Sequence, residues 1–237
     1  MIHGVVRVRD GVRIHYRRLG KGPGVALLHG FPQTGHMWRK VMPALAERFD
    51  VVAPDLRGYG DSDRPTTGYD KRSMAADIAP TYDIFERLDQ RSARRVWHWL
   101  FHMVPDLPEA LTAGREEIYL RYLYTAWAFN PAAIEEEAIQ EYLRCFRQAG
   151  AMRAAFDDYR AGGTVDLEHD AADRGKKVGV PTLVLWGGSW MTQSADMLGV
   201  WKERCERVEG FAVPDCGHFI PEEQPVVVLD AILKFVG

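Results

Sequence analysis

The stretch Val25-Ala26-Leu27-Leu28-His29-Gly30-Phe31-Pro32 decides the fold of this 237-residue chain. Its four consecutive apolar residues, closed by a Gly and a Pro, are typical of a strand buried on both faces of a sheet. A helical pattern over residues 37–49 follows, and Pro43 inside it must kink the helix or lie near its start. Val51-Val52-Ala53 is then a second buried strand. Strand, helix and strand with short connections predict a parallel α/β sheet.

The α/β pattern is interrupted in the middle of the chain. Residues 81–166 lose the strand signals, are rich in aromatic residues, and show helical runs over 84–103, 116–129 and 132–156. Strand patterns return over 181–186 and 208–213, and an amphipathic helix over 222–236 closes the sequence. We therefore predict an α/β core with helices on both faces, formed by residues 1–80 and 167–237, and an all-helical cap over 81–166.

Composition excludes several function classes. The net charge is -3 and the pI is near 6.2, so the sequence carries no electrostatic footprint for nucleic acid or acidic lipid. No apolar run approaches the ~20 residues that span a membrane, and no signal peptide pattern is visible at residue 1. Three cysteines at unrelated spacings predict neither a disulfide framework nor a metal site. We expect a reduced, cytoplasmic, soluble protein.

Two short segments carry candidate catalytic residues. His29-Gly30-Phe31-Pro32 lies at the carboxyl end of its strand, where such sheets bind ligands. It is either a tight turn or a hole whose backbone N–H groups stabilise a developing negative charge. His218 follows a late strand and precedes a helix, which favours a general base over a structural histidine. His98 and His102 are four residues apart, but nothing completes a metal site, so no metal is expected.

Three motifs in this order make the chain resemble the α/β-hydrolase superfamily. They are the turn after the first buried strand, the Gly-rich loop Asp55–Ser62, and Gly217-His218-Phe219. Further runs resemble the haloacetate (fluoroacetate) dehalogenase branch of that superfamily. These runs are Asp77-Ile78-Ala79-Pro80-Thr81-Tyr82, Trp97-His98-Trp99, Asp158-Tyr159-Arg160-Ala161-Gly162 and Gly217-His218-Phe219-Ile220-Pro221-Glu222-Glu223.

The resemblance implies hydrolytic dehalogenation of a small molecule, a short halogenated carboxylic acid, without a cofactor. In that branch an aspartate displaces the halide, and water activated by a His–Asp pair hydrolyses the resulting ester. By resemblance, His218 is the base and Asp77 the acid that orients it, while Phe31 lies at the turn lining the pocket. The implied halide donors are His98, Trp99 and Tyr159, which are neutral hydrogen-bond donors suited to a small anion. The oligomeric state stays open, with a homodimer as the arrangement considered.

The nucleophile is not visible in the sequence. An α/β-hydrolase elbow has the form G-x-[Ser/Asp/Cys]-x-G after a buried strand, and no such pattern occurs here. Residues 65–76 are all that separate the Asp55 loop from the Asp77 motif. A helix and two strands with their connections need roughly 40 residues. We expect the elbow and the central strands to be deleted, so that the strands at Val25 and Leu183 pair directly or leave buried edges in a destabilised fold.

Several functions therefore remain in competition. The chain is a catalytically dead dehalogenase relative, an enzyme with a substitute nucleophile such as Asp61 or Asp55, or a non-catalytic remnant that binds a small anion or carboxylate. A fourth alternative is an epoxide or ester hydrolase of the same superfamily, since the missing nucleophile sets the specificity.

Overall fold

The computed structural model describes residues 1–8, 10–74, 96–190 and 196–237, and its N-terminal part is a four-stranded sheet. The strand order is β1-β2-β4-β3, with β1 and β2 paired antiparallel, β2 and β4 antiparallel, and β3 and β4 parallel. The parallel pairing of β3 with β4 was predicted from sequence. The predicted burial of the Val25 strand on both faces is wrong: Gly24 and Ala26 are exposed and Val25 is half-buried, because β3 is an edge strand among the described pairings. The strands are β1 (Ile2–Arg7), β2 (Arg13–Gly20), β3 (Gly24–Ala26) and β4 (Asp50–Pro54).

The predicted helix over residues 37–49 is two short helices. The 3-10 helix η1 (Gly35–Lys40) ends before Val41, and α1 (Met42–Leu45) begins with Pro43 in its first turn. Proline lacks the N–H that a continuous helix would need at this point, which explains the break. Val41 and Leu45 are fully buried against the sheet, together with Val51 of β4.

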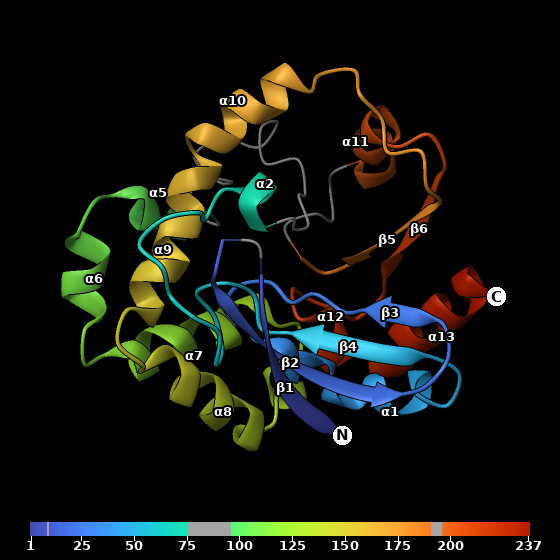
Figure 1. Cartoon of the computed structure of the whole chain (residues 1–237), viewed down its shortest axis with the longest axis horizontal. Coiled ribbons are helices and arrows are strands. Elements are labelled where there is room, and N and C mark those ends of the chain that lie inside the picture. Colours follow the sequence, from blue (N-terminus) through green and yellow to red (C-terminus); the bar gives the residue numbers. More distant parts are fainter. Residues whose placement is uncertain (9, 75–95, 191–195) are drawn as a thin grey trace.

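Helices dominate the region between β4 and β5, as predicted (Figure 1). The predicted helix over 132–156 is wrong in detail because the chain turns at Gly150, whose φ of 79° is left-handed. Most of the predicted helix over 84–103 lies outside the described residues. The helices are α2 (Lys71–Met74), α5 (Trp97–Met103), α6 (Leu107–Thr112), α7 (Glu116–Trp127), η2 (Pro131–Ala133), α8 (Glu136–Phe146), α9 (Ala151–Gly162) and α10 (Val165–Ala172).

The C-terminal part contains a second, two-stranded parallel sheet. It is followed by two helices, of which the last packs against α1 and β5. The elements are β5 (Thr182–Gly187), α11 (Met197–Arg204), β6 (Val208–Val213), α12 (Ile220–Glu223) and α13 (Pro225–Val236). No described helix is long and apolar enough to cross a membrane.

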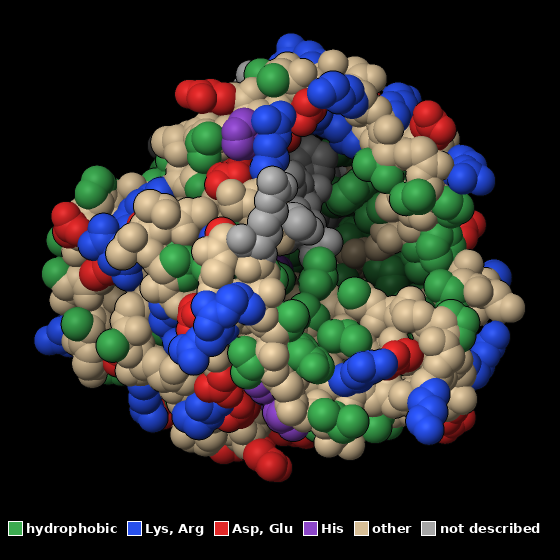
Figure 2. Space-filling view, viewed as in Figure 1, with side chains coloured by type: hydrophobic (Ala, Val, Ile, Leu, Met, Phe, Trp, Pro, Cys, Tyr) green, Lys and Arg blue, Asp and Glu red, His purple; other side chains and the backbone are tan. Residues whose placement is uncertain are grey.

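The two sheets are separate within the described parts of the chain. No described pairing joins β3 or β4 to β5, so the direct pairing considered above is not observed. The molecule is hollowed between the sheets, with hydrophobic side chains in the hollow (Figure 2). The highly apolar helix α13 accordingly fully buries only Val228, and Val226 is 67% exposed. Apolar surface that a continuous sheet would cover remains accessible here.

Candidate active site

His29 fixes the two loops that follow β3 and β4. Its Nε2 accepts a hydrogen bond from the backbone N–H of Leu56 at 2.9 Å, so the proton of the neutral ring lies on Nδ1, which is 3.2 Å from the Gly30 carbonyl. Burial lowers the pKa of His29 and keeps it neutral. The turn predicted to line a pocket is therefore attached to the neighbouring loop, and Phe31 points into the aromatic core of the helical region.

Backbone contacts position the loop that carries His218. The His218 N–H donates to the carbonyl of Trp127 at 2.8 Å. A Cβ on Gly217 would lie 2.3 Å from that same oxygen, so only glycine permits this approach. The Glu223 carboxylate accepts four backbone hydrogen bonds, two of them from the residues on either side of His218. Together these contacts join the loop to the end of α7.

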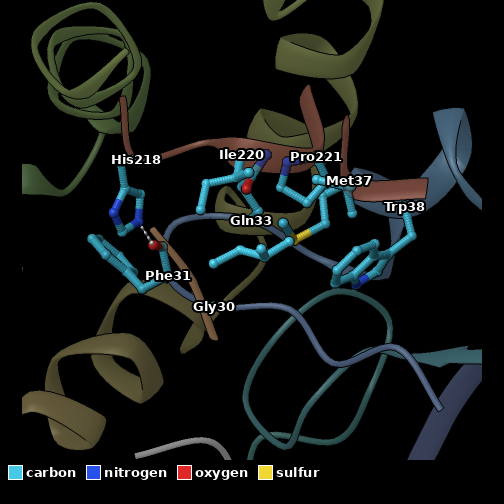
Figure 3. Close-up of a pocket in the computed structure, with 10 residues that line it drawn as sticks. Gly30, Phe31, Gln33, Met37, Trp38, His218, Ile220 and Pro221 are labelled. Carbon is cyan, nitrogen blue, oxygen red and sulfur yellow. Dashed lines mark hydrogen bonds between the residues drawn. The ribbon is translucent and has the colours of Figure 1, made fainter. Parts of the chain in front are cut away.

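The imidazole of His218 faces Phe31 (Figure 3). Its Nε2 lies 3.3 Å from the Phe31 carbonyl oxygen, and because a carbonyl only accepts, Nε2 is the protonated nitrogen in this arrangement. His218 is exposed, and it lines a cavity whose other lining residues are mostly apolar. Desolvation lowers the pKa of His218, although the Phe31 carbonyl acts in the opposite direction. His218 is a neutral base at pH 7.

A cavity of about 300 Å³ adjoins His218 and extends toward β5 (Figure 3). Its wall is mostly apolar, and Leu185 of β5 faces residues of the turn after β3 across it. The cavity thus lies at the gap between the two sheets. Its lining residues are Gly30, Phe31, Gln33, Met37, Trp38, Leu185, His218, Ile220, Pro221 and Val228.

The three predicted halide donors lie together. The ring centroids of His98 and Tyr159 are 5.9 Å apart, and those of Trp99 and Tyr159 are 6.0 Å apart. Tyr159 also contacts Phe31, with 5.3 Å between the centroids. Helices α5 and α9 pack against each other and bring these side chains to the same place. Three of the predicted side chains therefore gather beside the predicted turn.

Trp127 connects this group to His218 and was not singled out from the sequence. Its ring centroid is 4.5 Å from that of His98 and 5.1 Å from that of His218. Trp190 also packs against His218, with 5.5 Å between the ring centroids, and its ring is 5.9 Å from that of Trp127. The local sequence signal for this arrangement is Gly217, the glycine that precedes His218, because a glycine permits the close approach of the Trp127 carbonyl.

The aromatic group is electrostatically neutral. Desolvation, with a smaller effect of the charge on His218, lowers the pKa of His98 to about 3. Desolvation likewise lowers the pKa of His102 to about 2 and raises that of Tyr159 well above its usual value. Nδ1 of His98 is buried and has no hydrogen-bond partner among the described residues. The group is therefore neutral and includes one buried ring nitrogen without a hydrogen bond among the described residues.

Of the aspartates named from sequence, Asp55 and Asp61 are already engaged in hydrogen bonds. Asp77 lies outside the described residues. The buried Asp55 carboxylate accepts hydrogen bonds from His15, Arg17 and the Gly35 and Asp61 N–H groups, at 2.7 to 3.1 Å. Asp61 is held by Arg144 and Gln148, and this pairing lowers its pKa to about 2. Neither carboxylate is available as a substitute nucleophile, because both are committed to structural hydrogen bonds.

Comparison with known proteins defines the class. A family model described as alpha/beta hydrolase fold matches residues 23–97. The soluble epoxide hydrolase of Corynebacterium sp. (strain C12) is 36% identical over 273 residues, covering 95% of this chain and 94% of that protein. The fluoroacetate dehalogenase of Burkholderia sp is 32% identical over 257 residues, covering 87% and 84%. The chain belongs to the α/β-hydrolase family.

Solved structures agree with this assignment. A protein from Nostoc sp PCC 7120, described as a candidate α/β hydrolase, gives a TM-score of 0.95 at 37% identity and covers 99% of this chain and 97% of its own. The epoxide hydrolase CorEH gives a TM-score of 0.89 at 33% identity, with coverages of 99% and 98%. The predicted α/β-hydrolase class is confirmed. Among the relatives, epoxide hydrolases match at least as well as the dehalogenase.

Proposed function

We propose that this chain holds a small organic molecule of the haloacid type beside His218, and that its hydrolytic turnover is strongly reduced. The observation that carries the proposal is the environment of His218. The described residues supply a neutral base that lines a cavity, and a set of neutral donors that contact it only through Phe31 and Trp127, but no carboxylate or hydroxyl in contact with that base. A base alone activates water, whereas the family mechanism also needs a nucleophile that forms the ester.

The halide part of the proposal rests on the group formed by His98, Trp99 and Tyr159. Imidazole, indole and phenol groups each donate one hydrogen bond without carrying charge. Because burial keeps His98 and Tyr159 neutral, an anion bound there is stabilised by hydrogen bonds in a poorly solvated space, where such bonds are strong. Asp77 as the acid partner of His218 remains part of the proposal.

An epoxide is the second substrate class, supported by the 36% identity to the Corynebacterium epoxide hydrolase. A ring-opening epoxide also develops negative charge on oxygen, so the same donors would stabilise it. Halide binding separates the two classes. Bromide titration followed by tryptophan fluorescence is expected to saturate in the native chain and in His3→Ala, an exposed control, and to weaken in His98→Ala and Tyr159→Phe. Equal bromide affinity in all four proteins would favour epoxides over haloacids as the substrate class.

The reduced turnover is supported by the length of the relatives. The alignment with the Corynebacterium enzyme runs over 273 residues, which exceeds the 237 residues of this chain. The relative therefore has internal residues without a counterpart here. The gap between β3 and β5 is where a central layer of strands would lie in a continuous sheet. We infer that the absent residues include the nucleophile elbow.

The test measures halide release from fluoroacetate and chloroacetate, diol formation from styrene oxide, and ligand binding by calorimetry. We expect saturable binding of chloroacetate, with product formation no faster in the native chain than in His218→Ala. Rapid turnover that is lost in His218→Ala but kept in His3→Ala would refute the loss of the nucleophile. No heat at millimolar ligand would refute the binding site itself.

A further inference from the structure

Three metal-ligating side chains gather away from the cavity, where the turn before α2 meets α10 (Figure 1). Asp70, Asp166 and His169 each have a ligand atom within 4.8 Å of those of the other two. Asp166 and His169 are three residues apart on α10 and share one face of the helix. The backbone N–H of Lys71 donates to Asp166 Oδ1 at 2.8 Å and fixes the turn against this face.

Two of these residues have buried polar atoms without a hydrogen bond. Asp166 is only 7% exposed, and its Oδ2 has no hydrogen-bond partner among the described residues. The buried Nδ1 of His169 also lacks one in that part of the chain. An unsatisfied buried polar atom costs about 1–3 kcal/mol. Two such atoms in one cluster indicate that a ligand belongs between them, since native proteins rarely leave such groups unpaired.

The local charge favours a cation. Asp158 adds a third carboxylate near Asp166, and the Lys71 ammonium group contacts both Asp158 and Asp166. Its Nζ bonds to Asp158 Oδ1 and remains 3.9 Å from Asp166 Oδ2. Arg72 also reaches the His169 carbonyl oxygen at 3.4 Å, but it pairs with Asp173 at 2.7 Å, so the carboxylates of this region outnumber the cations. Desolvation, with Asp70 and Asp158 adding to it, raises the pKa of Asp166.

We propose that Asp70, Asp166 and His169 bind a divalent transition-metal ion, with Zn²⁺ as the best match. One imidazole and two carboxylates are a ligand set that Zn²⁺ accepts, whereas Mg²⁺ and Ca²⁺ prefer oxygen alone. Zinc–ligand bonds of about 2 Å put tetrahedral ligands roughly 3.3 Å apart, so the side chains close by at most about 1.5 Å. The ion attaches the turn at Asp70 to α10 and satisfies the buried atoms. Its role is structural and independent of the function proposed above.

A second cluster, formed by His15, Asp55 and Asp61, has the same spacing between ligand atoms but differs in its hydrogen bonding. His15 Nδ1 already bonds to Asp55 at 2.7 Å, and Arg17 lies 2.9 Å from the same carboxylate. In the proposed site Asp70 Oδ1 and Asp166 Oδ1 also accept backbone hydrogen bonds, but Asp166 Oδ2 and His169 Nδ1 have no hydrogen-bond partner among the described residues, whereas no atom of the second cluster is buried without one. This cluster therefore serves as an internal comparison for the experiment.

The test is a calorimetric Zn²⁺ titration of chelator-treated protein, with thermal unfolding as a second readout. We expect one equivalent to bind in the native chain and in Glu168→Gln, which removes an exposed carboxylate next to His169. Asp166→Asn and His169→Gln are expected to weaken binding at least tenfold and to abolish the rise in Tm that Zn²⁺ causes. Mg²⁺ at the same concentration should leave Tm unchanged.

Circular dichroism confirms that each variant is folded before titration, and Asp70→Asn is a third variant outside α10. Zn²⁺ binding that is unchanged in the three ligand variants, or absent from the native chain, would overturn the proposal. Loss of binding in His15→Ala instead would assign the ion to the other cluster and refute this site equally.

Discussion

Replacing the half-buried Glu223 by Ala should loosen the loop that carries His218. One oxygen of Glu223 accepts from the Gly217 and Phe219 N–H groups at 3.1 and 3.2 Å. The other accepts from the Phe129 and Asn130 N–H groups, at 2.7 and 3.0 Å. The side chain thus connects the two chain segments that hold the base and Trp127.

The magnitude follows from which donors water can reach. Hydrogen bonds to a charged group contribute about 1.5–3 kcal/mol each. The two bonds from Phe129 and Asn130 are exposed, so water replaces them at little cost. The two hydrogen bonds from Gly217 and Phe219 are partly buried, so their loss lowers the free energy of unfolding by more. We expect Glu223→Ala to lower the free energy of unfolding by about 3 kcal/mol, and Glu223→Gln to lower it by less because one carbonyl oxygen remains.

Urea unfolding followed by circular dichroism measures the loss, and Glu203→Ala is the matched control. Glu203 is exposed on α11, where a surface substitution should change stability by no more than about 0.5 kcal/mol. Tryptophan emission should also shift in Glu223→Ala, since Trp127 lies 5.1 Å from His218. If Glu223→Ala costs no more than Glu203→Ala, the carboxylate does not organise the loop and the reasoning fails.

Three further outcomes are expected. Gly217→Ala should destabilise the fold by about 2 kcal/mol in urea unfolding, because the added Cβ would lie 2.3 Å from a carbonyl oxygen; the native stability would contradict this. The pKa of His98 is lowered to about 3 in the folded chain, against about 6.5 when unfolded, so His98 takes up a proton in the unfolded chain first as the pH falls. The free energy of unfolding is therefore highest above about pH 6.5 and decreases down to about pH 3. The His98 contribution between pH 7 and 5 is about 2 kcal/mol, and His98→Gln should flatten the measured slope. An anilinonaphthalene dye should bind the cavity of about 300 Å³, and Leu185→Trp, which fills it, should reduce the fluorescence gain.

The sequence predicted those parts of the fold that depend on local pattern. The strand over 208–213 has the bounds of β6, and the strand at Val25 pairs in parallel with the strand at Val51 as strand-helix-strand order requires. The helix break at Gly150 was missed because the apolar pattern continues across it, and only the left-handed φ of that glycine reveals the turn.

The site was predictable only where a motif carries it. His98, Trp99 and Tyr159 lie together because α5 and α9 pack, and the motifs named all three. Trp127 could not be found in this way, because its contacts with both His98 and His218 arise from the approach of α7 to the loop after β6. Such an approach links residues far apart in sequence, and no periodicity records it.

The gap between the two sheets bears on both the stability and the function of this chain. Helix α13 is strongly apolar, yet it fully buries only Val228, and the cavity beside His218 is walled by Leu185 from the far sheet. If a central layer of strands is absent, as proposed, the helix loses the surface it would cover and the base loses the turn that would carry its nucleophile. The donors on α5 and α9 are unaffected, since they pack within the helical region. On the proposed function, binding and chemistry are therefore separated in this chain, because the groups proposed to hold the substrate and the group that would attack it belong to different layers of the fold.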